Sequence, residues 1–371
     1  MSAILDARGL RVSYAVGSRL VARLRRRPAP IVHAIDGIDL VVERGSAVGI
    51  VGESGCGKST LAKALVGLAP LSAGTVAFAG EPLGNRRTRA QTRHIQIVFQ
   101  DPSASLNPSM TIGQTLRELL RVHDMVPAGS VQRRAEELLE LVELPASLLN
   151  AYPRRLSGGQ RQRVGIARAL ALEPEILVAD ESVAALDVSV QAAILNLLQK
   201  LRTELGLTLL FISHDLAVVR HISDRVVVMY LGTIVEDRPT EDLFRDPRHP
   251  YTAALLEAAP QMGVMKQPGG SVLRGEPGSL HNLASGCRFH PRCPIAQDIC
   301  REEEPLLRGP SESAHDCQTE TDRAACHFAW TELSDRAKRN ERGNSPQAPE
   351  SEAQTSRGPE NLQPKNRMVS Q

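Results

Sequence analysis

A glycine-rich run, GESGCGKST, at residues 52–60 limits the folds open to this 371-residue chain. It follows the apolar run AVGIV and precedes LAKALVGL, whose apolar residues recur at helical spacing, so it joins a predicted strand to a predicted helix. Glycines allow the backbone to bend until successive amide groups, together with the positive end of the helix, face a phosphate group. The run, hereafter the P-loop, therefore predicts a polyphosphate site rather than a turn that binds nothing.

The P-loop side chains have separate expected tasks. Lys58 supplies a positive charge beside the β- and γ-phosphates, and the Ser59 hydroxyl coordinates a Mg²⁺ ion that bridges two phosphate oxygens. ATP and Mg²⁺ are therefore the expected ligands. The residues expected around the phosphates are Gly52, Glu53, Ser54, Gly55, Cys56, Gly57, Lys58, Ser59 and Thr60.

Two carboxylates follow a second apolar strand, ILVA, which ends directly before Asp180 and Glu181. Doubly wound folds bind their ligands at the carboxyl ends of such strands. We expect Asp180 to hold the Mg²⁺ ion through water and Glu181 to orient or deprotonate the water that attacks the γ-phosphate. An acidic pair at this position can also simply cap the next helix, but the P-loop upstream favours the catalytic interpretation.

The remaining pattern predicts an α/β fold. Short β-rich runs alternate with helical stretches, such as those at 130–144 and 190–205, which is typical of a mixed, substantially parallel sheet with helices. The 44 basic and 42 acidic side chains nearly cancel, so no field over the whole chain would attract nucleic acid. No run reaches the roughly 18 apolar residues that cross a bilayer, and the first residues lack a signal-peptide pattern, so we expect a cytoplasmic protein.

The segment LSGGQ at residues 156–160 lies about twenty positions before the carboxylates, and RQRVGIARALALEPEILVADE follows it. In this order, the P-loop, LSGGQ and the carboxylates resemble the ABC ATPase family. That family pairs two subunits head to tail, so that LSGGQ of one subunit covers the ATP on the P-loop of the other. Because the chain has one copy of each motif, a second ATPase subunit is expected. The resemblance implies nucleotide contacts for Ser157, Gly158, Gly159, Gln160 and Asp187.

Other positions match family residues in the expected order. The resemblance implies that Gln100 contacts Mg²⁺ and reports its occupancy to the permease, that His214 senses the γ-phosphate, and that Tyr14 stacks on adenine. Asp187 matches the aspartate of the D-loop, but SVAAL precedes it where relatives usually have a proline and a serine, so communication between the two sites is in question. The expected catalytic residues are Lys58, Gln100, Glu181 and His214.

Longer stretches, including VFQDPSASLNPSMTIG and DPRHPYTAALLEAAP, are similar to ATP-binding subunits of oligopeptide and dipeptide uptake systems, with nickel importers as relatives. The similarity runs from about residue 8 to residue 330. It implies ATP-driven import of peptides, a peripheral location on the cytoplasmic face of the membrane, two permease subunits, a second ATPase that is a copy or a paralogue, and indirectly an extracytoplasmic solute-binding protein. No nucleic acid is expected as a partner.

Two other classes compete with this interpretation. A soluble ABC ATPase acting on nucleic acid or the ribosome shares the motifs, but DNA-repair forms insert long coiled coils that the short separation of Lys58 from Asp180 does not accommodate. Ribosomal forms usually fuse two ATPase units in one chain. A small-molecule kinase shares the P-loop but offers no reason for LSGGQ.

Cysteines gather near the C-terminus, where Cys287, Cys293 and Cys300 are spaced by six and seven positions, with Cys326 or Cys317 as a fourth thiol. Thiolates suit zinc or an iron–sulfur cluster, and the spacing alone does not choose between them or exclude free thiols. The transporter family has a similar pattern that is associated with a [4Fe–4S] cluster. The resemblance thus implies Cys287, Cys293, Cys300 and Cys326 as its ligands.

The predicted organisation has three parts. An ABC-type P-loop ATPase core with a helical subdomain at about 100–170 occupies residues 1–260. A small segment at 261–333, hereafter the Cys-rich segment, follows a stretch rich in proline and glycine. Residues 334–371 have few apolar side chains and are expected to be disordered.

Overall fold

The computed structural model describes residues 2–15, 31–101, 106–182, 187–258, 278–310 and 321–330. Several predictions concern residues outside these ranges. They are the altered turn at 183–186, the domain boundary near 260, the thiol of Cys317 and the tail at 334–371.

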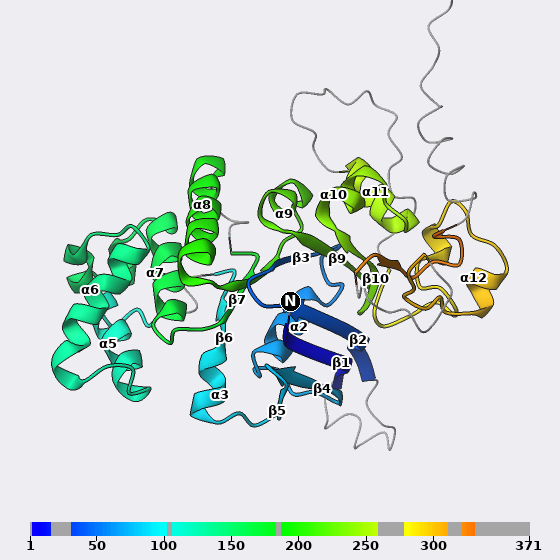
Figure 1. Cartoon of the computed structure of the whole chain (residues 1–371). Coiled ribbons are helices and arrows are strands. Elements are labelled where there is room, and N and C mark those ends of the chain that lie inside the picture. The colour runs from blue at the N-terminus through cyan, green and yellow to red at the C-terminus, as the bar shows by residue number, and fades with distance from the viewer. Residues whose placement is uncertain are drawn as a thin grey trace, which may run out of the picture.

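A seven-stranded sheet forms the centre of the described structure, in the order β11-β10-β9-β3-β8-β7-β6 (Figure 1). Its strands are β3 (Ala47–Val51), β6 (Ile95–Val98), β7 (Ile176–Asp180), β8 (Thr208–Ile212), β9 (Arg225–Tyr230), β10 (Thr233–Pro239) and β11 (Arg323–Ala324). The strands from β6 to β9 pair in parallel, whereas β10 and β11 add antiparallel pairs at one edge. The prediction of a mixed, largely parallel sheet is confirmed.

The central strands are apolar throughout because both faces of the sheet are covered. On β3, Val48 and Ile50 belong to one hydrophobic core and Ala47 and Val51 to the other, since successive side chains point to opposite faces. In Figure 1, helices α8 (Val188–Leu205) and α9 (Leu216–Ile222) lie on one side of the sheet, and α2 (Lys58–Leu65) lies on the other. The P-loop therefore begins at a strand fixed from both sides.

The first two predicted strands belong to a separate sheet. They pair antiparallel in a four-stranded sheet of order β2-β1-β4-β5. Its strands are β1 (Ala3–Ala15), β2 (Ile31–Glu43), β4 (Ala73–Phe78) and β5 (Glu81–Leu83). Leu61 and Leu65 of α2 share one core with both sheets, so α2 is held between them. The runs at residues 8 and 38 are strands as predicted, but they do not extend the parallel sheet.

Helices α5, α6 and α7 form a group at one side of the molecule (Figure 1). Helix α5 begins with a capping box in which the side chains of Thr111 and Gln114 satisfy each other's backbone amides. The remaining α-helices are α3 (Arg89–His94), α5 (Ile112–Val122), α6 (Val131–Leu141), α7 (Gly158–Leu170), α10 (Thr240–Arg245), α11 (Pro250–Ala258) and α12 (Ile299–Glu302). The 3-10 helices are η1 (Ala128–Ser130), η2 (Ala146–Asn150), η3 (Pro153–Arg155) and η4 (His290–Arg292). Among the helices of the described ranges, none has both the length and the hydropathy needed to cross a bilayer.

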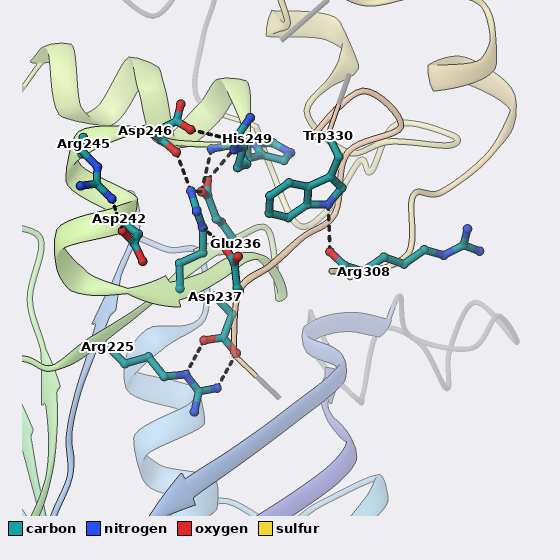
Figure 2. A network of polar contacts seen from close by, with 12 residues as sticks. Arg225, Glu236, Asp237, Asp242, Arg245, Asp246, His249, Arg308 and Trp330 are labelled. Atoms are coloured by element: carbon teal, nitrogen blue, oxygen red, sulfur yellow. Dashed lines mark hydrogen bonds and ion pairs between the residues drawn. The ribbon is translucent and has the colours of Figure 1, made fainter. Parts of the chain in front are cut away.

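A buried polar network attaches the end of the Cys-rich segment to the sheet (Figure 2). Strand β11 pairs with β10, and Arg323 donates to Asp237 over 2.8 Å. The fully buried Asp237 carboxylate also accepts a forked pair of hydrogen bonds from Arg225. Next to it, Glu236 accepts from the backbone amides of Arg248 and His249, at 2.7 and 2.9 Å. Residues 323–325 are therefore held by the edge of the sheet itself.

This network predicts a pH dependence of stability. Burial lowers the pKa of His249 from 6.5 to about 3, so its contribution to stability is present above pH 6.5 and is lost as the pH falls toward 3. Burial raises the pKa of Glu236 from 4.5 to about 7, which acts in the opposite direction: its contribution is full below pH 4.5 and is lost as the pH rises through 7. Because the pH-dependent contributions of His249 and Glu236 partly cancel in the wild type, the contribution of either residue can be measured only by comparison with a variant.

Replacing His249 by asparagine removes the titrating ring but keeps an acceptor for the backbone amide of Tyr251, which now donates to the ring over 3.0 Å. Relative to this variant, the wild type should lose about 2 kcal/mol of unfolding free energy between pH 7.5 and 5. Urea denaturation at both values measures the difference. His221→Asn, at an exposed position on α9, should follow the wild type. An equal pH response of His249→Asn and the wild type would contradict the prediction.

Candidate functional site

The P-loop joins β3 to α2, as predicted, in a conformation that requires glycine. Gly57 has φ 110° at the N-terminal cap of α2, and a Cβ atom there would lie 2.5 Å from the carbonyl oxygen of Ala34. At Gly52, with φ 154°, a Cβ atom would lie 2.3 Å from the carbonyl oxygen of Met229. Both distances are shorter than a non-bonded contact allows, so a side chain at either position would displace the loop.

Lys58 lies inside the P-loop and is only 4% exposed. Its Nζ atom donates to the carbonyl oxygens of Gly52 and Glu53, at 2.8 and 3.0 Å. The ammonium group is therefore held in the hollow of the loop, where a phosphate would meet it. Cys56 is buried beside it, and burial raises the pKa of its thiol, so this side chain packs as a neutral group.

Ser59 and Asp180 meet where a Mg²⁺ ion is expected. The Ser59 hydroxyl donates to Oδ1 of Asp180 over 3.0 Å, and Asp180 is 4% exposed. A serine hydroxyl and a carboxylate are ligand types that suit Mg²⁺, the first directly and the second through a bound water, so these residues fit that ion. Burial raises the pKa of Asp180 above its usual value and the charge of Glu181 adds to this, while the Ser59 hydrogen bond opposes both. A bound cation would favour the ionised carboxylate.

The structure brings Gln100, Glu181 and His214 together from the ends of the adjacent strands β6, β7 and β8. Nε2 of Gln100 donates to Oε2 of Glu181 over 2.7 Å, and Nδ1 of His214 lies 3.5 Å from Oε1 of the same carboxylate. Glu181 has φ 43°, a left-handed conformation that is uncommon for a residue with a side chain. Such strain at the end of a buried strand is typical of a functional position.

Ser157, Gln160, Asp187 and Tyr14 form no hydrogen bond or ion pair with this group among the described contacts. Ser157 and Gln160 form a capping box at the start of α7, with distances of 3.2 and 3.0 Å. Of the described hydrogen bonds and ion pairs, none joins residues 156–160 to the P-loop. Asp187 is exposed at the start of α8, and Tyr14 is 43% exposed on β1. Within one chain these residues are free to meet another molecule.

The cysteines of the Cys-rich segment lie near one another. Burial, and then the nearby thiols of Cys293, Cys287 and Cys300, raise the pKa of Cys326 to about 12. The backbone amide of Cys287 donates to the carbonyl oxygen of Cys300 over 2.8 Å. However, the described residues contain no group of three or more His, Cys, Asp or Glu arranged to hold a metal ion. The iron–sulfur ligands gain no support here and stay a prediction from the resemblance.

Two further residues, which sequence reasoning did not single out, contact the P-loop at Glu53. Arg292 donates from both terminal nitrogens to the Glu53 carboxylate, at 2.9 Å each. The backbone amide of Glu53 donates to the hydroxyl of Tyr251 over 2.8 Å. Arg292 follows Cys287 by five positions and Tyr251 lies in α11, so no local pattern connects either residue with the loop.

Comparison with known proteins agrees with this geometry. The family model "ABC transporter" matches residues 35–184, and "Oligopeptide/dipeptide transporter, C-terminal region" matches residues 235–300. A putative peptide import ATP-binding protein of Brucella abortus is 49% identical over 282 residues, which are 75% of this chain and 84% of the relative. The chain belongs to the ATP-binding subunits of ABC transporters. The oligopeptide transport ATP-binding protein OppF of Escherichia coli is 47% identical over 297 residues, covering 78% and 89% of the two chains.

Solved structures support the fold of this ABC ATPase. The ATP-binding cassette MJ0796, in a dimeric post-hydrolysis state bound to ADP and phosphate, has a TM-score of 0.55 and 29% identity. The match covers 64% of this chain and 98% of that cassette. This ABC ATPase binds ATP with Mg²⁺ and hydrolyses it.

Proposed function

We propose that this ABC ATPase powers the import of dipeptides or oligopeptides across the cytoplasmic membrane, acting from its cytoplasmic face. The observation that carries the proposal is the match of residues 235–300 to the C-terminal region of oligopeptide and dipeptide transporters. The relatives named for peptide import, similar over three quarters of this chain, add to it. The alternative of a soluble ATPase acting on nucleic acid or the ribosome has no such support.

The proposed roles in hydrolysis follow from the contacts of each side chain. Glu181 accepts the proton of the attacking water, and its left-handed backbone and the hydrogen bond from Gln100 fix the direction of the carboxylate. Nδ1 of His214 lies beside the other carboxylate oxygen, Oε1, and the ring donates a hydrogen bond to the γ-phosphate. Lys58 neutralises phosphate charge from inside the loop. Ser59 directly, Asp180 through water, and Gln100 would hold a Mg²⁺ ion, whose chemistry would be to add positive charge at the phosphate oxygens.

The proposed partners follow from the nucleotide site, which is proposed to need residues from a second subunit. Ser157, Gly158, Gly159, Gln160 and Asp187 are offered to the nucleotide of a second ATPase subunit, a copy or a paralogue, across a head-to-tail dimer. Tyr14 is exposed on β1 and is proposed to stack on adenine. Two permease subunits receive the motion of this dimer, and an extracytoplasmic solute-binding protein delivers the peptide to them.

Uptake by cells tests the proposed substrate. Cells that lack this chain should fail to accumulate labelled di- and oligopeptides and should recover with the wild-type chain but not with Glu181→Gln. The same cells should accumulate labelled nickel and free amino acids normally. Affinity capture of the full chain from detergent-solubilised membranes, with mass spectrometry, should recover two multi-span permeases and a second ATPase. Normal peptide uptake without the chain, or capture of ribosomal proteins alone, would refute the proposal.

A further inference from the structure

We propose that Arg292 and Tyr251 are positioning residues for the nucleotide site: they hold Glu53, and through it the P-loop, in the shape that receives ATP. Both lie in the part of the chain that matches the transporter C-terminal region rather than the ATPase domain. The inference rests on the proposed nucleotide site and assigns to this C-terminal part a direct effect on ATP affinity.

The contact between Arg292 and Glu53 is a forked pair of hydrogen bonds. Both terminal guanidinium nitrogens meet a separate carboxylate oxygen at 2.9 Å, so the planar groups fix each other's orientation. The Arg292 side chain is 6% exposed and the Glu53 side chain 22%. At this depth water competes weakly for either partner, and the pair holds its geometry better than a surface ion pair would.

Tyr251 holds the same residue by its backbone. Its hydroxyl accepts the amide hydrogen of Glu53 over 2.8 Å. The ring is fully buried against Tyr230 and Phe289, with centroid distances of 4.6 and 5.4 Å. Phe289 precedes Arg292 by three positions, so the two contacts belong to one packed unit. Glu53 is therefore fixed at its side chain and at its main chain from the same side.

The position of Glu53 matters because its carbonyl oxygen accepts from Nζ of Lys58 over 3.0 Å. The carbonyl oxygen of the neighbouring Gly52 accepts from the same ammonium group. Gly52 has φ 154°, a backbone conformation that residues with a side chain rarely adopt. A loop with such torsions loses conformational entropy when it orders around phosphate. Holding it in the bound shape beforehand raises affinity, since that loss is not incurred on binding.

A second arginine of the same segment provides a matched control. Arg288 donates to the carbonyl oxygen of Leu231 and to Asp36, at 2.6 Å each, and its side chain is as deeply buried as that of Arg292. Both arginines attach the segment to the ATPase core, but Arg288 contacts Leu231, Asp36 and Glu304, none of which belongs to the P-loop. Replacing either arginine should thus weaken the attachment of the segment to the ATPase core. Only replacement of Arg292 should also release the P-loop from its position.

The test is the affinity of the full-length chain for a fluorescent ATP analogue with Mg²⁺. Arg292→Gln should weaken binding about tenfold, Tyr251→Phe about threefold and Arg288→Gln less than twofold. Arg292→Lys, which keeps one hydrogen bond, should lie between Arg292→Gln and the wild type. Glu53→Gln should match Arg292→Gln, and the double variant should bind no more weakly than either single one, because both remove the same contact.

The outcomes separate the inference from the proposed function. Failure of the wild type to bind the analogue overturns the proposed nucleotide site itself. Wild-type binding with unchanged affinity in Arg292→Gln overturns the inference alone, and so does an equal loss in Arg288→Gln. Should Arg292→Gln not fold, Tyr251→Phe and Arg292→Lys decide, since both preserve most of the packing; wild-type affinity in both overturns the inference.

Discussion

Replacing Glu181 by glutamine should lower kcat for ATP hydrolysis by about 100-fold or more, while ATP affinity stays within about twofold of the wild type. Glutamine has nearly the shape of glutamate and still bonds with Gln100, but it cannot accept the proton of the attacking water. The loss is therefore confined to the chemical step. Phosphate release at saturating ATP measures kcat, and fluorescence titration measures the affinity.

The control for this prediction is Glu175→Gln, at the opposite end of the same strand. Glu175 pairs with Arg44 and His94 at the surface and should leave kcat unchanged on replacement. If Glu181→Gln kept more than about a tenth of the wild-type kcat, the general base would have to be another residue, with His214 as the first to examine.

Replacing Lys58 by methionine should weaken binding of Mg²⁺-ATP by about 100-fold or more. Methionine keeps the unbranched stem that packs in the loop but removes the charge that faces the phosphates. It also leaves the carbonyl oxygens of Gly52 and Glu53 without their shared donor. Titration with a fluorescent ATP analogue measures the loss, and a thermal melt in the absence of nucleotide reports any change of the fold.

Lys63→Met is the matched control, because Lys63 lies exposed in the last turn of the same helix α2. It makes the same change of charge and should leave affinity within about threefold. Equal weakening by both replacements would mean that the general field of the helix, rather than contact inside the loop, attracts the phosphates.

The placement of the proposed site's motifs on strands and helices could be predicted, because each motif is a short, contiguous run. The P-loop, the carboxylates after β7 and the glutamine after β6 each combine a strand, a turn and specific polar side chains within a few residues. Parallel strands then bring their carboxyl ends to one edge, so residues as distant as Gln100 and His214 converge on Glu181 without any pattern that pairs them. The order of the motifs along the chain, rather than the spacing within any one of them, predicted that they belong to one site.

Sheet membership was less predictable. The runs at residues 8 and 38 have strand periodicity, but periodicity does not tell which strands a strand will pair with. The register shifts between β1 and β2, and the antiparallel pairing of β1 with β4, have no local signal in the sequence. The Cys-rich segment is a similar case, since spacing indicated a cluster but could not give its geometry.

The contact of Arg292 with Glu53 could not have been predicted. The two residues are 239 positions apart, and in the sequence each looks like an ordinary charged surface residue. Only the return of the Cys-rich segment to the ATPase core makes them neighbours. Buried pairs of this kind depend on the tertiary fold alone, which one sequence without its relatives does not reveal.

The short strand β11 has a consequence for how the chain avoids self-association. It pairs with β10, whose own side chains are buried and whose outer edge would otherwise present unpaired backbone groups. An open edge of this kind can recruit strands from other molecules. Any shortened form that ends before residue 321 would uncover this edge and leave Asp237 with Arg225 but without Arg323. Pairing of Arg323 and Ala324 with β10 should therefore make strand addition by other molecules at this edge less favourable.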